Sequence, residues 1–323
     1  MVPAPLAAAV VAAPDDPAGY LVAADWLQSH GDPLGELIIL MWGLEHEQSP
    51  AHFIIKKRRK DELLQEHAEE WLGGAHLEEA VWRWGFVSQA RLQVEHLELL
   101  LRSRAGRFVR ELEIHGPIED LPAVLSRVEA PALSRLALVG GRRAPSLHVA
   151  SVLKLLPQLR RLAVHVPDAD LSGLDMSGLQ DLRLLEVQHP SLTPFLTGLA
   201  SPELVHLELL VDAPLELKAH AATQAPRLRE FHIEDDLADD LALWASKTPL
   251  VRQLESLHLC GPMTDRGLDA LLFEAARLNR LNIAIEGGHF STPLRRLAHR
   301  QLPKLAFHRT RAQASWWKGR PGY

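Results

Sequence analysis

The 323-residue sequence contains a single cysteine, Cys260, and no apolar run of the roughly 18 residues that a membrane-spanning helix needs. One cysteine excludes a disulfide framework, and it also excludes zinc and iron–sulfur sites that are built from several cysteines. It fits a reducing compartment, so we expect a cytoplasmic protein. We expect no membrane association, because no segment is long and apolar enough for it.

The common signatures of catalysis and of nucleic-acid binding are also missing. The sequence has no glycine-rich phosphate loop, no Ser-His-Asp signature and no His-Glu-x-x-His motif. The net charge is −6, which is −8 for residues 1–85 (14 acidic, 6 basic) and +2 for the remainder (27 acidic, 29 basic). Neither part has the basic character of a nucleic-acid-binding domain.

One apolar pattern recurs ten times from Val87 onward: apolar, two residues, apolar, one residue, apolar. Successive copies begin 22 to 26 residues apart, at Val87, Val109, Leu133, Leu159, Leu182, Leu204, Leu228, Leu254, Leu278 and Leu302. The period and the Leu-x-x-Leu-x-Leu spacing are those of a leucine-rich repeat. Alternate residues of a strand point to one side, so the last two apolar residues of each copy would face a shared core. One repeat cannot bury its own apolar face, so the copies must stack.

We therefore predict an α/β solenoid, a leucine-rich-repeat-like horseshoe with a parallel sheet on its concave side. The array is expected over residues 86–308, with a cap or tail over residues 309–323. The Asn or Cys that usually follows each strand in such repeats is absent, which indicates irregular return segments. Trp316 and Trp317 suit a cap over the open end of the core, although a docking segment is the alternative.

The first 85 residues have helical periodicity and form a separate, all-helical domain in this prediction. Apolar residues recur at spacings of three and four in residues 6–11, 20–27, 34–44 and 53–72. Gly31 suits the position after a helix end, and Asp32 with Pro33 suits the start of the next helix. A tight helix–helix turn is therefore expected at these residues.

Specific motifs also lie in this segment. They are Ala24-Asp25-Trp26-Leu27, Gly31-Asp32-Pro33-Leu34-Gly35-Glu36, Trp71-Leu72-Gly73 and Trp84-Gly85-Phe86. Residues 6–86 thereby resemble the bacterial repeat-companion domain, although Ala23 stands where that family usually has tyrosine. The resemblance implies a domain that precedes degenerate leucine-rich repeats, and it implies no particular activity.

The predicted concave face carries the candidate binding residues. Because neighbouring strands lie about 4.8 Å apart, equivalent positions in successive repeats become side-chain neighbours. A dense polar patch is predicted from His206, Glu208, Glu230, His232, Glu234, His258 and Cys260. The same face is predicted to include Arg135, Arg161, Glu186 and Arg280. We predict that it binds a protein or peptide, with no nucleic acid, no cofactor and no catalytic or metal-ligating residue.

Three other interpretations compete with this one. The chain could be an accessory subunit that presents a substrate protein to a separate enzyme. Glu208, His232 and His258 could form a metal-dependent hydrolase site, since two histidines and a carboxylate are a familiar ligand set. Three neighbouring strands span about 9–10 Å, however, which is too wide for one ion and favours a polar binding surface. Cys260 could be a nucleophile with His258 or His232 as its base, but a lone cysteine in a repeat is usually inert.

The basic run at residues 56–60 could contact nucleic acid or anionic lipid. Acidic residues follow it at once, beginning with Asp61 and Glu62 at helical spacing from the basic side chains. We interpret the run as the solvated face of a helix.

Overall fold

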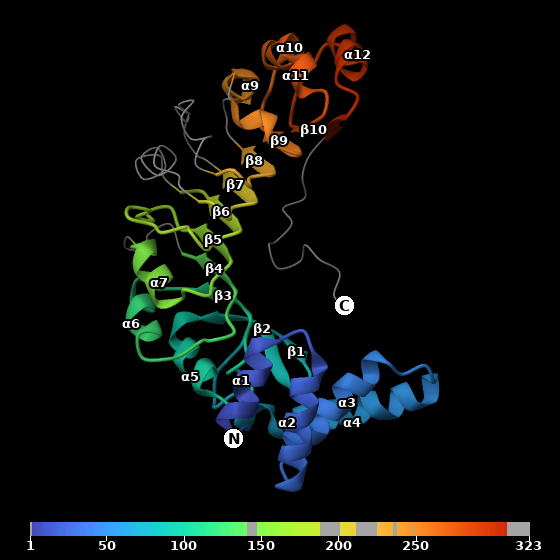
Figure 1. Cartoon of the computed structure of the whole chain (residues 1–323), viewed down its shortest axis with the longest axis vertical. Coiled ribbons are helices and arrows are strands. Elements are labelled where there is room, and N and C mark those ends of the chain that lie inside the picture. Colours follow the sequence, from blue (N-terminus) through green and yellow to red (C-terminus); the bar gives the residue numbers. More distant parts are fainter. Residues whose placement is uncertain are drawn as a thin grey trace. The chain divides into compact units, whose positions relative to one another are not determined.

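The computed structural model describes residues 2–140, 147–187, 201–210, 225–234, 238–247 and 249–308. The chain divides into two compact units. The first comprises residues 1–147 and 151–160, and the second comprises residues 148–150 and 161–323. Figure 1 labels most of the elements of both. Within the described residues, no helix combines the length and apolar character needed to cross a membrane.

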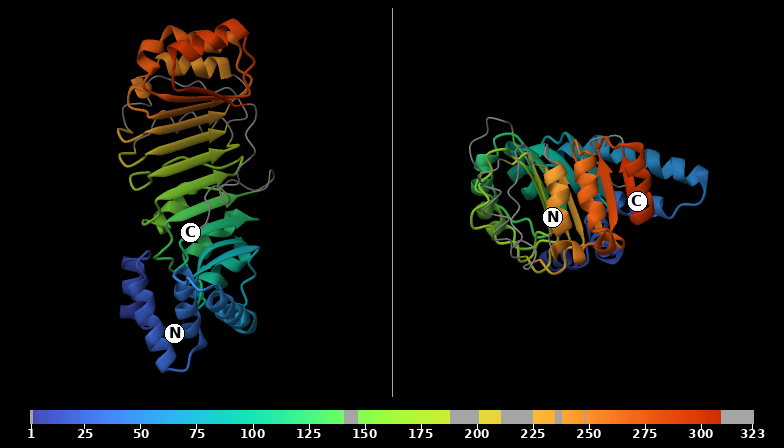
Figure 2. Two further views of the ribbon diagram at one scale, coloured as in Figure 1. Left: turned by 90° about the vertical axis from the view of Figure 1, so that its right-hand side faces the viewer. Right: turned by 90° about the horizontal axis from the view of Figure 1, so that it is seen from above.

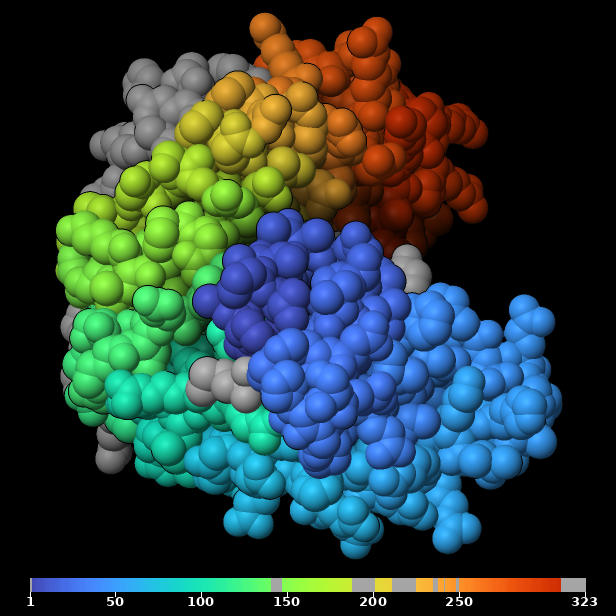
Figure 3. Space-filling model, turned by 60° about the horizontal axis from the view of Figure 1, so that its bottom comes forward, coloured from blue at the N-terminus to red at the C-terminus, as the bar shows by residue number. Residues whose placement is uncertain are grey.

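The first unit begins with the four expected helices: α1 (Ala4–Ala12), α2 (Pro17–Ser29), α3 (Pro33–Glu45) and α4 (Pro50–Trp71). The predicted turn between α2 and α3 is present. Gly31 has a positive φ of 70°, and the Asp32 carboxylate accepts a hydrogen bond of 3.1 Å from the Leu34 N–H. The end of α3 and the start of α4 form a surface lobe, light blue in Figure 3.

The segment before residue 86 also contains a strand, so the prediction of an all-helical segment was wrong. Strand β1 (Glu79–Arg83) pairs antiparallel with β2 (Phe86–Gln93). Trp84 and Gly85 connect them with φ values of 45° and 79°, as in a two-residue hairpin turn that requires positive φ at both positions. The strand is short and has no buried residue, so it carries no apolar alternation that a sequence pattern could reveal.

Parallel strands and short helices complete the first unit. Strand β3 (Glu111–His115) lies between β2 and β4 (Arg135–Val139), parallel to both. The return segments contain η1 (Val94–His96), α5 (Leu97–Arg102), η2 (Ile118–Asp120) and α6 (Leu121–Leu125), and α7 (Val149–Leu155) comes before β5 in the chain. The return segments between these strands are therefore irregular, as predicted.

The second unit is a parallel sheet in chain order, with helices against one of its faces (Figure 2). Its strands are β5 (Arg161–His165), β6 (Asp181–Leu185), β7 (His206–Leu210), β8 (Glu230–Glu234), β9 (Ser256–Cys260), β10 (Asn282–Glu286) and β11 (Leu305–His308). Its helical segments are α9 (Ala238–Lys247), η4 (Pro249–Arg252), α10 (Asp265–Phe273), α11 (Ala275–Leu278) and α12 (Thr292–Gln301).

Alternate strand residues form the core between sheet and helices, as the repeat pattern predicts. Buried pairs at matching positions are Leu207/Leu209, Phe231/Ile233, Leu257/Leu259 and Ile283/Ile285. Their polar neighbours therefore lie on the opposite face of the sheet, which positions the candidate site.

Two predicted registers were wrong. In β6, Leu182 and Leu184 face the core and pair with Leu207 and Leu209, whereas the prediction placed Leu185 and Val187 there. Leu179, Leu182 and Leu184 also fit the Leu-x-x-Leu-x-Leu spacing, so two overlapping patterns compete in this stretch.

In β10 the core pair is Ile283 and Ile285, two residues later than predicted. Glu186 and Arg280 consequently lie outside the strands, Glu186 after β6 with a positive φ of 54° and Arg280 before β10.

Candidate functional site

The polar face of the second unit brings together side chains from five consecutive strands. Parallel register sets Arg183 beside Glu208, Glu208 beside His232, and His232 beside His258. Cys260 lies between Glu234 and Glu286 in the same register. We call this group the sheet-face cluster: Arg183, His206, Glu208, Glu230, His232, Glu234, His258, Cys260 and Glu286.

Glu208 is the buried carboxylate at the centre of one half of the cluster. Its Oε1 lies 3.1 Å from His232 Nδ1, and its Oε2 lies 3.2 Å from Arg183 Nη1. Burial opposes ionisation of Glu208, but the neighbouring His206 and His232 side chains and the charge of Arg183 outweigh it and hold its pKa well below the usual range. Glu208 is therefore a fixed anion that orients the His232 ring.

His206 lies between two carboxylates on neighbouring strands. Its Nδ1 is 3.0 Å from Glu230 Oε2, and its Nε2 is 3.8 Å from Glu208 Oε2. Burial lowers the pKa of His206, but the carboxylates of Glu208, Asp181 and Glu230 outweigh burial and raise it above the ordinary value. This imidazole therefore carries positive charge at higher pH than a free histidine does.

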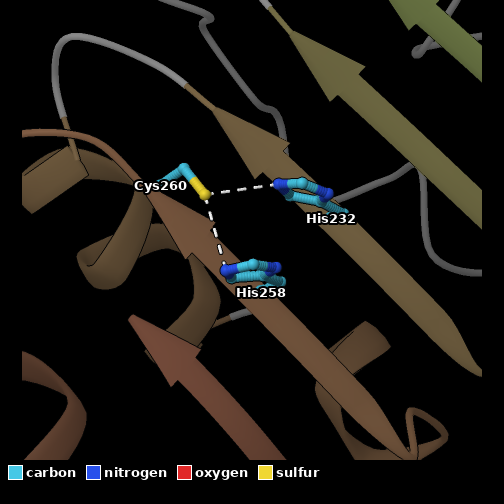
Figure 4. A group of neighbouring side chains, drawn as sticks. All are labelled: His232, His258 and Cys260. Atoms are coloured by element: carbon cyan, nitrogen blue, oxygen red, sulfur yellow. Dashed lines mark hydrogen bonds between the residues drawn. The ribbon is translucent and has the colours of Figure 1, made fainter. Parts of the chain in front are cut away.

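The other half of the cluster is formed by His232, His258 and Cys260 (Figure 4). The two imidazole rings are stacked, with centroids 4.3 Å apart and planes at 18°. Cys260 Sγ lies 3.3 Å from His232 Nε2 and 3.5 Å from His258 Nε2. The alternative metal set of Glu208, His232 and His258 does not converge on one point, because Glu208 contacts Nδ1, the opposite nitrogen of the His232 ring. Cys260 Sγ, and not a Glu208 oxygen, lies beside the Nε2 atoms of both histidines.

Arg183 and Glu286 were missed by the sequence analysis. Both omissions follow from the register errors in β6 and β10. Glu286 is buried, and its Oε2 lies 3.5 Å from His258 Nε2 and 3.6 Å from Cys260 Sγ. The overlapping Leu179/Leu182/Leu184 pattern and the Ile283-x-Ile285 pair were the signals that could have identified them.

The other predicted face residues lie outside the cluster. Arg161 begins β5 opposite Asp181, and Glu186 pairs with His165 at 3.1 Å. Arg280 is exposed before β10. Arg135 belongs to the first unit, where it pairs with Glu111 of β3. Trp316 and Trp317 lie outside the described residues.

The basic run on α4 is engaged in ion pairs, as expected of a solvated helix face. Lys56 Nζ lies 2.7 Å from Glu47 Oε2, and Arg59 Nε lies 2.7 Å from Glu36 Oε1. Arg58 Nε is 3.0 Å from Glu62 Oε1, one helical turn along.

Comparisons with known proteins bear on the fold. No protein-family model matches the chain, and no curated protein sequence matches it. Among solved structures, a Bacteroides fragilis protein has a TM-score of 0.54 at 14% identity, covering 65% of this chain and 68% of that one. Human 5T4 (Wnt-activated inhibitory factor 1, trophoblast glycoprotein) has a TM-score of 0.45 at 22% identity, covering 63% and 77%. The first similarity, with the parallel sheet and its helical returns, indicates a solenoid-like α/β fold.

Proposed function

We propose that the chain is a non-catalytic recognition module that binds a protein segment carrying Lys or Arg side chains across the polar face of the second unit. The observation that carries this proposal is a pair of exposed carboxylates on β8. The Glu230 side chain is 59% exposed, and Glu234 at the end of the strand is exposed and has no ion-pair partner within the described parts of the chain. Charge complementarity favours a basic partner at this point.

The rigidity of this face supports binding. Each strand from β5 to β10 is anchored by two buried apolar residues, so the polar side chains project from a fixed backbone. Ion pairs such as Glu208 with Arg183 order the side chains before any partner arrives. A preorganised surface loses little conformational entropy on binding, which favours affinity.

The first 85 residues are assigned here to a repeat-companion-like domain, and residues 86–308 to a leucine-rich-repeat-like array. The assignment rests on the motifs from Ala24 to Glu36 and on the repeat spacing. The net charge of −8 over residues 1–85 supports a basic partner as well.

Affinity capture from native lysate, followed by mass spectrometry, tests the proposal. The bait is the full chain, and it is compared with the Glu230→Lys/Glu234→Lys double variant. Asp269→Lys is the matched control, because this exposed carboxylate lies on α10, among the helices behind the sheet.

The wild type and the control should capture the same proteins, and the double variant should not capture them. Salt should elute these proteins, because it screens the charges on which binding depends. A set of captured proteins that is identical for the double variant would contradict binding at this face. Capture of an enzyme together with its substrate would instead favour the accessory-subunit interpretation.

A further inference from the structure

Four metal-ligating side chains meet on strands β8, β9 and β10: His232, His258, Cys260 and Glu286. Three of them, His232, His258 and Cys260, have donor atoms that all lie within 4.8 Å of one another. His232, Cys260 and Glu286 are buried, and His258 is partly exposed. Figure 4 shows both imidazoles directed at the sulfur.

Four of the six separations between these donor atoms are close to those around one small ion, and Glu286 contacts two of the three members of the compact group. Cys260 Sγ lies 3.3 and 3.5 Å from the two imidazole Nε2 atoms and 3.6 Å from Glu286 Oε2. His258 Nε2 lies 3.5 Å from the same carboxylate oxygen. Zinc bonds of about 2.0–2.1 Å to nitrogen or oxygen and about 2.3 Å to sulfur, arranged as a tetrahedron, place their donor atoms about 3.3–3.6 Å apart.

The surroundings orient His232 in the way that is usual for a metal-bound histidine. Glu208 binds Nδ1 of His232 at 3.1 Å, which leaves Nε2 of that ring directed toward Cys260. Arg183 in turn holds Glu208 at 3.2 Å. A carboxylate on the far nitrogen is the usual partner of a metal-bound histidine, because it sets the tautomer and the direction of the ring.

We propose that His232, His258 and Cys260 bind one zinc ion between the adjacent strands β8 and β9, and that Glu286 of β10, which reaches the sulfur and the His258 ring, is its fourth ligand. A thiolate, two imidazoles and a carboxylate are ligands that select zinc over magnesium or calcium. The thiolate and the carboxylate neutralise the charge of a divalent ion, which lowers the cost of burying it. Binding transfers the Cys260 thiol proton to solvent. Four protein ligands close the coordination sphere, so the ion is structural and activates no water.

The test uses the full chain stripped of metal with EDTA and titrated with zinc chloride or cobalt chloride. We expect one ion per chain, a thiolate-to-cobalt charge-transfer band in the near ultraviolet, and protection of Cys260 from a thiol reagent by zinc. Because Cys260 is the only cysteine of the sequence, the last two signals report on this residue alone.

Three variants locate the ion. Cys260→Ser should abolish the charge-transfer band and weaken zinc binding. Glu286→Gln keeps the side-chain shape and should weaken binding while the band persists. Glu208→Gln, a change in a positioning residue, should lower zinc affinity by about 10–100-fold with the band retained. His165→Gln is the matched control, because His165 lies on the polar face of β5 and pairs with Glu186 instead.

Far-UV circular dichroism of the stripped variants distinguishes loss of the fold from loss of a ligand. If Cys260→Ser does not fold, Glu286→Gln and Glu208→Gln still test the site. A wild-type chain that binds no zinc at micromolar free metal overturns the proposal. So does zinc binding that leaves Cys260 reactive, or a cobalt spectrum without the thiolate band. These outcomes are independent of partner binding, which the Glu230→Lys/Glu234→Lys variant tests.

Discussion

Glu113 is a buried carboxylate on β3 of the first unit. Its Oε1 lies 2.7 Å from Arg91 Nε and 2.8 Å from His115 Nε2, while Glu79 approaches the far side of Arg91 at 3.4 Å. Burial works to raise the pKa of Glu113, but the hydrogen bonds from His115 and Arg91 and the charges of both outweigh it and lower the pKa. The folded state therefore favours the ionised form.

A lowered folded-state pKa predicts how stability depends on pH. The carboxylate stabilises the fold above its unfolded-state pKa of about 4.3, and this contribution is lost as pH falls through the lower folded-state value. Glu113→Gln should reduce the free energy of unfolding at pH 7 by about 1–3 kcal/mol. The difference from wild type should shrink between pH 5 and pH 3, as measured by urea unfolding. A difference that stays constant over this range would contradict the assignment, and Asp269→Asn on the exposed face of α10 serves as the control.

At the scale of the elements, the β1–β2 hairpin depends on two backbone conformations that most residues avoid. Trp84 and Gly85 both have positive φ. A Cβ at position 85 would lie 2.4 Å from Ile38 Cγ1 on α3, so only glycine fits beneath this helix. The hairpin thus fixes the contact between the N-terminal helices and the sheet within the first unit.

Gly85→Ala is expected to destabilise the chain by about 1–3 kcal/mol, because backbone strain and a steric clash act together. Gly74→Ala is the matched comparison. Gly74 has a similar φ of 78° with nothing within 4 Å of an added Cβ, so only the strain applies. Thermal unfolding should show the larger fall in melting temperature for position 85. Equal falls would show that the contact with Ile38 costs nothing.

Sequence patterns predicted the helices and strands better than the register in which the strands pair. The four N-terminal helices and the parallel strands other than β6 and β10 lie where apolar spacing and capping residues placed them, since both signals are local. Strand β1 was not predicted, because it has no buried residue. In β6, Leu182/Leu184 and Leu185/Val187 fit the repeat equally well, and only pairing with Leu207 and Leu209 of β7 selects between them.

At the scale of the molecule, stability should be distributed along the stacked strands. Each repeat of a solenoid packs against its neighbours alone, so a defect should propagate along the array over a short distance. Leu257 on β9 is fully buried between Phe231 of β8 and Ile283 of β10. Truncation of the Leu257 side chain would leave a cavity shared by three strands of the second unit.

Leu257→Ala should lower the free energy of unfolding by about 2–5 kcal/mol. Hydrogen exchange followed by mass spectrometry should show faster exchange in β8, β9 and β10, with β2 to β4 of the first unit unchanged. Leu99→Ala, a truncation of an apolar side chain that is 45% exposed, is the control and should leave both regions unaffected. A uniform increase in exchange over both units would contradict the expected local response.

The sequence by itself determined the repeat, the helices with their caps and, in every predicted strand except β6, the side of the sheet on which each polar residue lies. These features depend on periods of two and about four residues, which are readable along the chain. Tertiary structure alone decided that Cys260 lies between His232 and Glu286, residues 28 and 26 positions away in the chain. That convergence depends on strand register and on side-chain rotamers, and a shift of a few residues, as in β6 or β10, changes every neighbour on the face.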